Sequence, residues 1–339
     1  MTIINNIEID NVFFKQNHIK SAITNNEPLE EKLNVIAVIS NPCLFAKRYI
    51  LMNEFIKRIQ MEETNVNLFI VELCYGNQNF VITNENNPNH LQLRSDVPLW
   101  HKENMINIGV KKLLPRGWKS FAWIDADIEF ENNTWAIDTL KVLNGCSDIV
   151  QLFSHCADLD ENDLTMSVFN SFGYQYSKGN KYCGKGPNFW HPGYAWAMTR
   201  KAYEKVGGLY ELSILGSGDH MMAYSLIGNA LNSISKLANE QYRQSIRDYQ
   251  NKCNGLRLGY IPGVIRHYYH GTKLNRKYNE RWSIIINNNY DPTIDIEYND
   301  DGLLIPTNHF SISFRNEIMD YFKVRNEDED LDVWIKNKH

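Results

Sequence analysis

The sequence of 339 residues predicts an α/β fold with a mostly parallel, doubly wound sheet flanked by helices. Short runs rich in β-branched residues, such as NVIAVIS at 34–40, lack polar alternation, as expected of strands that are buried on both faces. Segments with apolar residues at helical spacing separate these runs. Strands that alternate with helices form parallel sheets, and such sheets bind ligands outside the carboxyl ends of their strands.

The expected elements follow one another from residue 34. The strand 34–40 leads through Asn41 and Pro42 into a helical segment at 49–59. An amphipathic helix over 100–115 ends at Pro115, which cannot continue it. The other expected strands are 66–76, 121–130, 147–153 and a pair within 294–306, and the other expected helices lie around 134–144, 199–209, 221–231 and 235–255.

Three parts are expected along the chain: an N-terminal arm at 1–31, a main domain at 32–285 and a C-terminal extension at 286–339. The acidic run from Glu327 to Asp330 is expected to be solvated. The segment 170–193, rich in Gly, Lys and aromatic residues, is either a surface insertion or a lid that folds over an anionic, ring-bearing ligand.

The composition is that of a soluble globular protein, with 43% hydrophobic and 22% charged residues. A net charge of -5 argues against a nucleic-acid partner held by bulk electrostatics. The six cysteines form no C-x-x-C pair, which favours free thiols in a reducing compartment. Neither a signal peptide nor a run of about 18 apolar residues is readable, so we expect no transmembrane segment and a cytoplasmic protein, soluble or peripherally associated. The frequent Asn, Ile and Lys are typical of an AT-rich genome, such as that of a large DNA virus or an intracellular parasite.

Two carboxylates interrupt the apolar run FAWIDADIEF at 121–130. In an extended strand Asp125 and Asp127 point to the same face, while Ala126 points to the other. Carboxylates this close repel each other unless a cation lies between them. The alternative is a strand that simply ends in solvent.

A second group of polar residues lies in VIRHYYHGTKLNRKYNERW at 264–282. His267 and His270 precede a basic cluster that includes Arg276. Neutral imidazole can complete a carboxylate site for Mn²⁺, and the basic side chains can hold a phosphate. Alternatively, these are surface histidines in a basic loop.

The third candidate is Asp219 in the Gly-rich turn GSGDH at 216–220. Glycines let the backbone turn tightly and bring the carboxylate close to a ligand. Asp219 can equally cap the helix that follows. Near residue 193, the aromatic rings of Trp190, Tyr194 and Trp196 either stack on a ring-bearing ligand or belong to the core.

These motifs occur in a specific order: D-x-D at a strand end, HPGYAWAMTRKAYEKVGGLYE, a Gly-rich turn with an acid, and H-x-x-H-G followed by R-x-x-x-x-R. The ordered set resembles the GT-A glycosyltransferases, in the broad family-two-like and galactosyltransferase-like group, over roughly residues 34–285. The resemblance implies the Rossmann-like GT-A fold and a metal-dependent enzyme that uses a nucleotide diphosphate sugar.

The resemblance also implies roles for individual residues. Asp125 and Asp127 would hold Mn²⁺, or Mg²⁺, against the two phosphates of the donor. His270 is the first choice for a further metal ligand, and His267 is the alternative. Asp219 would be the base that deprotonates the acceptor in an inverting reaction. The family often has a Glu-Asp pair at this turn, whereas this chain has Gly218 before the aspartate, which leaves acceptor binding in doubt.

The donor is expected to be a UDP-sugar and the acceptor a hydroxyl of a glycan, glycolipid or glycoprotein. Glu72 would bind the nucleoside or serve as a structural carboxylate. Residues implied to contact the donor are Ser40, Asn41, Pro42, Glu72, one of Arg94, Lys102 and Asn107, then Asp125, Ala126, Asp127, Gly193, Trp196 and Arg276. Two alternatives remain: a nucleotide-sugar or glycan-binding protein of the same fold without turnover, and a metal-dependent nucleotidyltransferase. The latter usually has a Gly-rich phosphate loop after its first strand, and NVIAVISNPCLF has none.

Overall fold

The computed structural model describes residues 2–4, 7–9, 17–184, 189–277, 280–329 and 331. Within the predicted lid, residues 185–188 lie outside the described part. Among the helices that are described, none has the length and apolar character of a membrane span.

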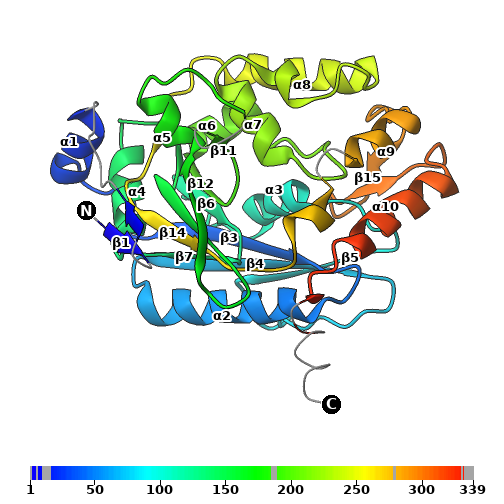
Figure 1. Cartoon of the computed structure of the whole chain (residues 1–339), viewed down its shortest axis with the longest axis horizontal. Helices are drawn as coiled ribbons and strands as arrows, with labels where there is room; N and C mark the ends of the chain where they lie inside the picture. The colour runs from blue at the N-terminus through cyan, green and yellow to red at the C-terminus, as the bar shows by residue number, and fades with distance from the viewer. Residues whose placement is uncertain are drawn as a thin grey trace.

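A seven-stranded sheet forms the centre of the molecule (Figure 1). In spatial order its strands are β13 (Leu258–Tyr260), β8 (Ile149–Gln151), β12 (Ala195–Thr199), β6 (Ser120–Ile124), β3 (Leu33–Ser40), β4 (Val66–Tyr75) and β5 (His90–Ser95). All neighbouring pairs are parallel except the two that β12 makes with β8 and β6. The prediction of a mostly parallel α/β sheet is therefore confirmed.

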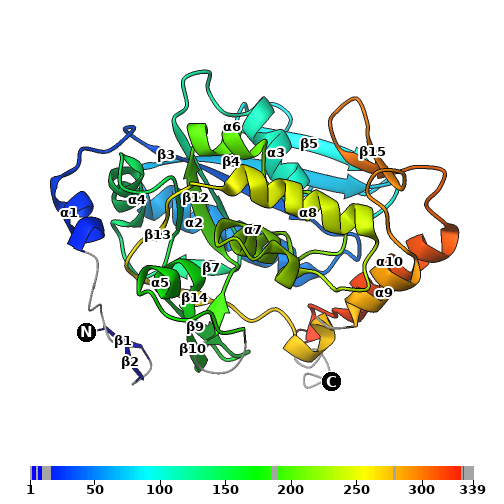
Figure 2. The ribbon, with the colours of Figure 1, turned by 90° about the horizontal axis from the view of Figure 1, so that it is seen from above.

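Helices cover both faces of this sheet, and the side chains of the interior strand β3 alternate between the two cores that result. Val35 and Ala37 of β3 belong to a cluster that also contains Phe55 of α2 (Ala46–Glu62) and Leu140 of α4 (Trp135–Leu143). Ile36 belongs to the other cluster, which contains residues of α3, α6, α7 and α8. These four helices lie on the face of the sheet opposite α2 (Figures 1 and 2). The bounds of these four helices are Lys102–Lys112, Arg200–Val206, Gly218–Leu226 and Glu240–Cys253.

The edge strand β5 is absent from the sequence prediction. Its sequence HLQLRS mixes polar and apolar residues, and only two of its six residues are buried. A half-buried edge strand has no continuous apolar run, so the signal that identifies β3 and β4 is missing.

A second sheet has five strands, and its edge strand β7 (Ile128–Phe130) starts directly after the D-x-D motif. In spatial order it contains β11 (Trp190–His191), β10 (Thr165–Ser171), β9 (His155–Leu159), β14 (Val264–His267) and β7. The segment expected as one strand at 121–130 is thus two strands in two different sheets. Asp125 and Asp127 lie in the turn between them, so the expectation that both side chains share one face of an extended strand is wrong.

The remaining elements lie around this framework. They are β1 (Thr2–Ile4), β2 (Ile7–Ile9), α1 (Asn17–Asn25), α5 (Phe172–Ser177), the 3₁₀ turns Ala230–Ser233 and Lys273–Arg276, α9 (Arg281–Asn287), β15 (Ile296–Tyr298), β16 (Leu304–Pro306) and α10 (Ile312–Val324). The predicted strand pair within 294–306 is confirmed as the antiparallel hairpin of β15 and β16. Tyr290, Phe314 and Ile318, which fall in the predicted C-terminal extension, belong to the same core as α3 and α7.

Glu327 in the acidic run after α10 is buried, and Asp328 contacts the start of α2, which corrects the expectation of a solvated stretch; Asp330 lies outside the described residues. Only 2% of Glu327 is exposed, and its carboxylate pairs with Arg48 at 2.5 Å and with Arg325 at 2.8 Å. The Asp328 carboxylate accepts hydrogen bonds of 2.8 Å from the backbone N–H groups of Ala46 and Lys47. A carboxylate is favourable there because the first N–H groups of a helix have no partner within the helix.

Candidate active site

The D-x-D turn is held by backbone hydrogen bonds on both sides. The Asp125 N–H donates to the carbonyl of Tyr194, and the Tyr268 N–H donates to the carbonyl of Asp127, at 2.9 and 2.8 Å. Tyr194 precedes β12 and Tyr268 follows β14, so the turn is fixed between the two sheets. The two aspartates consequently engage different partners.

Asp127 lies against both histidines of the H-x-x-H-G segment. Its Oδ2 is 2.9 Å from His270 Nε2 and 3.6 Å from His267 Nε2. One oxygen or nitrogen atom from each of the three residues lies within 4.8 Å of the others. The structure thus brings together Asp127, His267 and His270 from the predicted metal ligands, while Asp125 lies outside this group.

Two buried atoms in the group lack a hydrogen bond. Within the described residues, neither Asp127 Oδ1 nor His267 Nε2 has a hydrogen-bond partner. An unsatisfied buried polar atom costs free energy, and such atoms mark sites completed by an ion or water. One carboxylate with two imidazoles is a donor set that suits Mn²⁺ and related divalent cations, so the residues present fit a metal.

The charges in the group also suit a cation. Burial alone would raise the pKa of Asp127, but the charge of His267 and the hydrogen bond from His270 hold it well below its usual range. Burial lowers the pKa of His270 to about 4, and the nearby Arg276 guanidinium acts in the same direction. The closest approach of Arg276 is 2.7 Å, from Nη2 to His270 Nε2. His270 is therefore neutral at pH 7, as a metal ligand must be.

Asp125 is joined to Asp219 by the ammonium group of Lys102. Lys102 Nζ lies 2.6 Å from Asp125 Oδ1 and 3.0 Å from Asp219 Oδ2. Burial raises the pKa of Asp125 to about 7, Lys102 opposes this shift, and Asp127 and Asp219 add to it. Although burial would lower the pKa of Lys102, the two aspartates raise it well above its usual value. Lys102 therefore stays charged and screens the two carboxylates from each other.

Asp219 lies in the first turn of α7 and faces this cluster. Ser217 is the residue that precedes the helix, with a left-handed φ of 81°, and Asp219 bonds to Lys102. Because Ser217 holds the cap position and Asp219 bonds to Lys102, Asp219 is better explained as a site residue than as a helix cap. Gly193 lies beside it, since a Cβ at that position would be 3.8 Å from Asp219 Oδ2.

Two of the predicted donor contacts instead support the fold. The Glu72 carboxylate accepts hydrogen bonds from the backbone N–H groups of Val81, Ile82 and Thr83, with distances of 2.8 Å to Val81 and 2.7 Å to Thr83. Glu72 is 2% exposed. Of the two roles expected for it, nucleoside binding or a structural carboxylate, the structure favours the second. Asn107 is also buried, and its side-chain amide bonds to both the N–H and the carbonyl of Leu209.

The end of β3 and the loop after β4 are tied to each other. The Asn41 side chain bonds to the N–H and carbonyl of Phe45, at 2.9 and 2.8 Å, and thereby forms the entry to α2. The carbonyls of Asn41 and Pro42 accept hydrogen bonds from Gln78. Arg94 is exposed, donates to the Gln78 carbonyl at 3.0 Å and lies over the ring of Phe80. The Ser40 carbonyl accepts a hydrogen bond from Arg48 at 2.6 Å.

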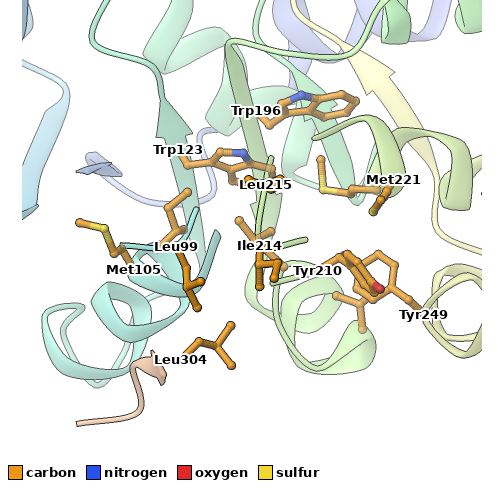
Figure 3. Close-up of a cluster of buried hydrophobic side chains, with 14 of the residues drawn as sticks. Leu99, Met105, Trp123, Trp196, Tyr210, Ile214, Leu215, Met221, Tyr249 and Leu304 are labelled. Atoms are coloured by element: carbon orange, nitrogen blue, oxygen red, sulfur yellow. The ribbon is translucent and has the colours of Figure 1, made fainter. Parts of the chain in front are cut away.

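Trp196 is a core residue, which corrects the prediction that its ring contacts the sugar. It is fully buried, and its ring stacks on Trp123 at a centroid distance of 6.4 Å (Figure 3). Its Nε1–H donates to the Pro192 carbonyl at 2.8 Å. Tyr194, in contrast, packs at the site, with its ring 4.4 Å from His191 and 4.6 Å from His267.

No family model matches the sequence, and no curated protein matches it. Solved structures with similar folds include a mutant of Drosophila β1,4-galactosyltransferase 7 in complex with manganese, UDP-Gal and xylobiose. It has a TM-score of 0.40 and 10% identity over 81% of this chain and 94% of that one. A mannosyltransferase from Pyrobaculum calidifontis with GDP-Man and Mn²⁺ has a TM-score of 0.39 and 12% identity, over 80% of this chain and 67% of that one. The catalytic domain of the Drosophila enzyme with xylobiose has a TM-score of 0.33 and 11% identity, over 82% of this chain and 95% of that one. Because TM-scores below 0.5 carry no argument about activity, we base the function on the site itself.

Proposed function

We propose that the chain is a metal-dependent, inverting glycosyltransferase of the GT-A type. It would transfer a sugar from a nucleotide diphosphate sugar to a hydroxyl group of a glycan or glycoconjugate. The observation that carries the proposal is the pairing of two features across one turn. A carboxylate–imidazole group suited to a cation lies on one side of Ala126, and the Asp125–Lys102–Asp219 cluster lies on the other.

The first feature accounts for the leaving group. A divalent cation held by Asp127, His267 and His270 would neutralise the charge that develops on the departing nucleoside diphosphate. The mixed oxygen and nitrogen ligands favour Mn²⁺ over Mg²⁺, which prefers oxygen alone. Arg276, next to His270, supplies positive charge on the same side of the site.

The second feature accounts for attack by the acceptor. The Asp219 carboxylate takes the proton from the acceptor hydroxyl, a step worth about 10² to 10⁴ in rate for a well-placed base. Lys102 fixes the position of this carboxylate, and Gly193 lies beside it. Attack assisted by a base on the face opposite the leaving group inverts the anomeric centre, so a product of retained configuration would contradict this role of Asp219.

UDP is proposed as the nucleotide because of the sequence resemblance to galactosyltransferase-like enzymes. The test is the thermal stability of the purified protein with UDP-, GDP-, dTDP- and CMP-sugars, each with and without Mn²⁺. A ligand at 100 times its dissociation constant stabilises a protein by about 2.7 kcal/mol, which is readily measured. Stabilisation by one nucleotide class that requires Mn²⁺ supports the proposal, and transfer assays with that donor then separate an enzyme from a binding protein. No stabilisation by any donor contradicts it.

A further inference from the structure

Asp158 and His267 are neighbours because the strand order of the second sheet makes them so. Strands β9 and β14 are parallel, and their register pairs Asp158 with His267. On the other side of β14, His267 is paired with Ile128, the residue that follows Asp127. The register therefore sets Asp158 beside His267, and Asp127 lies in the turn that leads into the strand on the other side of His267.

The contact between Asp158 and His267 is short and protected from water. His267 Nδ1–H donates to Asp158 Oδ1 at 2.7 Å, and both side chains are at most 3% exposed. The other oxygen of Asp158 pairs with the ammonium group of Lys273 and lies 3.4 Å from Ser167 Oγ. Both oxygens of the carboxylate are therefore held in place.

This hydrogen bond decides which nitrogen of His267 is available as a ligand. With its proton on Nδ1, the neutral ring carries its lone pair on Nε2, which faces Asp127. Nε2 has no hydrogen-bond partner within the described part of the chain. Metal-binding histidines commonly donate the second N–H to a carboxylate, which fixes the tautomer and the ring orientation.

We propose that Asp158 is the positioning residue of the metal centre. It holds His267 in the tautomer and orientation that present Nε2 to a divalent cation together with Asp127 and His270. This inference rests on the proposed metal-dependent function. Lys273 balances the charge of Asp158, so the network adds no net negative charge to the centre, and the Tyr194 ring packs against the imidazole at 4.6 Å.

The first test is the affinity of the full chain for Mn²⁺, measured without donor by the electron paramagnetic resonance signal of the free ion. In Asp158→Asn an amide replaces the carboxylate at nearly the same shape. We expect Mn²⁺ to bind 10- to 100-fold more weakly, the usual effect of losing such a partner. The matched control is Asp148→Asn, which breaks the ion pair with Arg257 and has no partner in the metal group. Its Mn²⁺ affinity should equal that of the wild type.

The second test needs no substitution that could disturb folding. Long-range ¹H–¹⁵N spectra of the metal-free wild type, labelled at histidine, report which ring nitrogen of His267 carries the proton when the ring is neutral. A proton on Nδ1 is expected. A proton on Nε2, or an unchanged Mn²⁺ affinity in Asp158→Asn when the wild type binds Mn²⁺, would overturn the role of Asp158 and leave the proposed function standing. If the wild type binds no Mn²⁺, both proposals fail.

Discussion

The carboxyl group of Glu103 occupies the space that a side chain at Gly218 would need. A Cβ at position 218 would lie 2.3 Å from both Oε1 and Cδ of Glu103. Glu103 reaches this place from the first turn of α3 and is 4% exposed. Burial, reinforced by Asp219, raises its pKa to about 8. An acid is therefore present beside the proposed base, although it comes from α3 and not from position 218.

This packing predicts that Gly218→Ala destabilises the protein by about 1–3 kcal/mol, the usual cost of overfilling a packed site. The measurement is chemical denaturation at neutral pH. The matched control is Gly117→Ala, because nothing lies within 4 Å of a Cβ there. The control should change the stability by less than about 1 kcal/mol. Equal effects of the two substitutions would mean that Glu103 moves aside freely.

The two aspartates of the D-x-D motif should differ in their effect on Mn²⁺ binding. Asp127→Asn removes a charge from the metal group and should weaken Mn²⁺ binding by at least tenfold, about 1.4 kcal/mol. Asp125→Asn should leave the donor-free affinity within a few-fold of the wild type, because Asp125 pairs with Lys102 outside the group. Equal losses in both variants would place Asp125 among the metal ligands.

The Asp219→Asn substitution should separate binding from turnover. The amide keeps the shape of the side chain but cannot accept the acceptor proton, so we expect kcat to fall by about 10² to 10⁴. The affinity for Mn²⁺ and donor should remain, because Asp219 contacts neither histidine of the metal group. Titration calorimetry checks the binding, and a transfer assay checks the rate. Loss of donor affinity in the variant would make Asp219 a donor-binding residue.

The sequence pattern predicts the elements that are buried on both faces. NVIAVIS and VNLFIVELCYG lie in β3 and β4 because a strand that is buried on both faces needs a continuous apolar run. The same rule fails at FAWIDADIEF, because the chain leaves one sheet and enters another at the aspartates while the composition stays apolar. Local patterns carry no information about which sheet a strand joins.

Only those residues of the candidate site that stand in short sequence motifs could be predicted. Asp125, Asp127, Asp219 and the two histidines stand in short motifs, and their assembly follows from the resemblance. Asp158 carries no such signal, since its role depends on the register of β9 against β14, more than 100 residues apart in sequence. The position of Trp196 near Gly193 allows a contact with the sugar or a place in the core, and the alternation of β12 turns its ring into the core.

The buried acid Glu327 predicts a specific pH dependence of stability. Burial alone would raise its pKa, but the charges of Arg48 and Arg325, with the hydrogen bond from Arg48, hold it well below its usual range. A group whose pKa is depressed in the folded state contributes stability above its unfolded-state pKa of about 4.3 and loses it as the pH falls towards the folded value. Glu327→Gln leaves two guanidinium groups unpaired and should cost about 3 kcal/mol at neutral pH.

The measurement is the free energy of unfolding of wild type and Glu327→Gln between pH 3 and pH 8 on the same buffer series. The difference between the two proteins should be constant above about pH 5.5 and should shrink as the pH falls below about 4.3, where the wild-type acid in the unfolded chain takes up its proton. The control is Glu204→Gln, which removes an exposed pair with Arg200 and should change stability by at most about 0.5 kcal/mol at any pH. A difference that does not vary with pH would show that Glu327 stabilises the C-terminal segment through shape and hydrogen bonding, not through its charge.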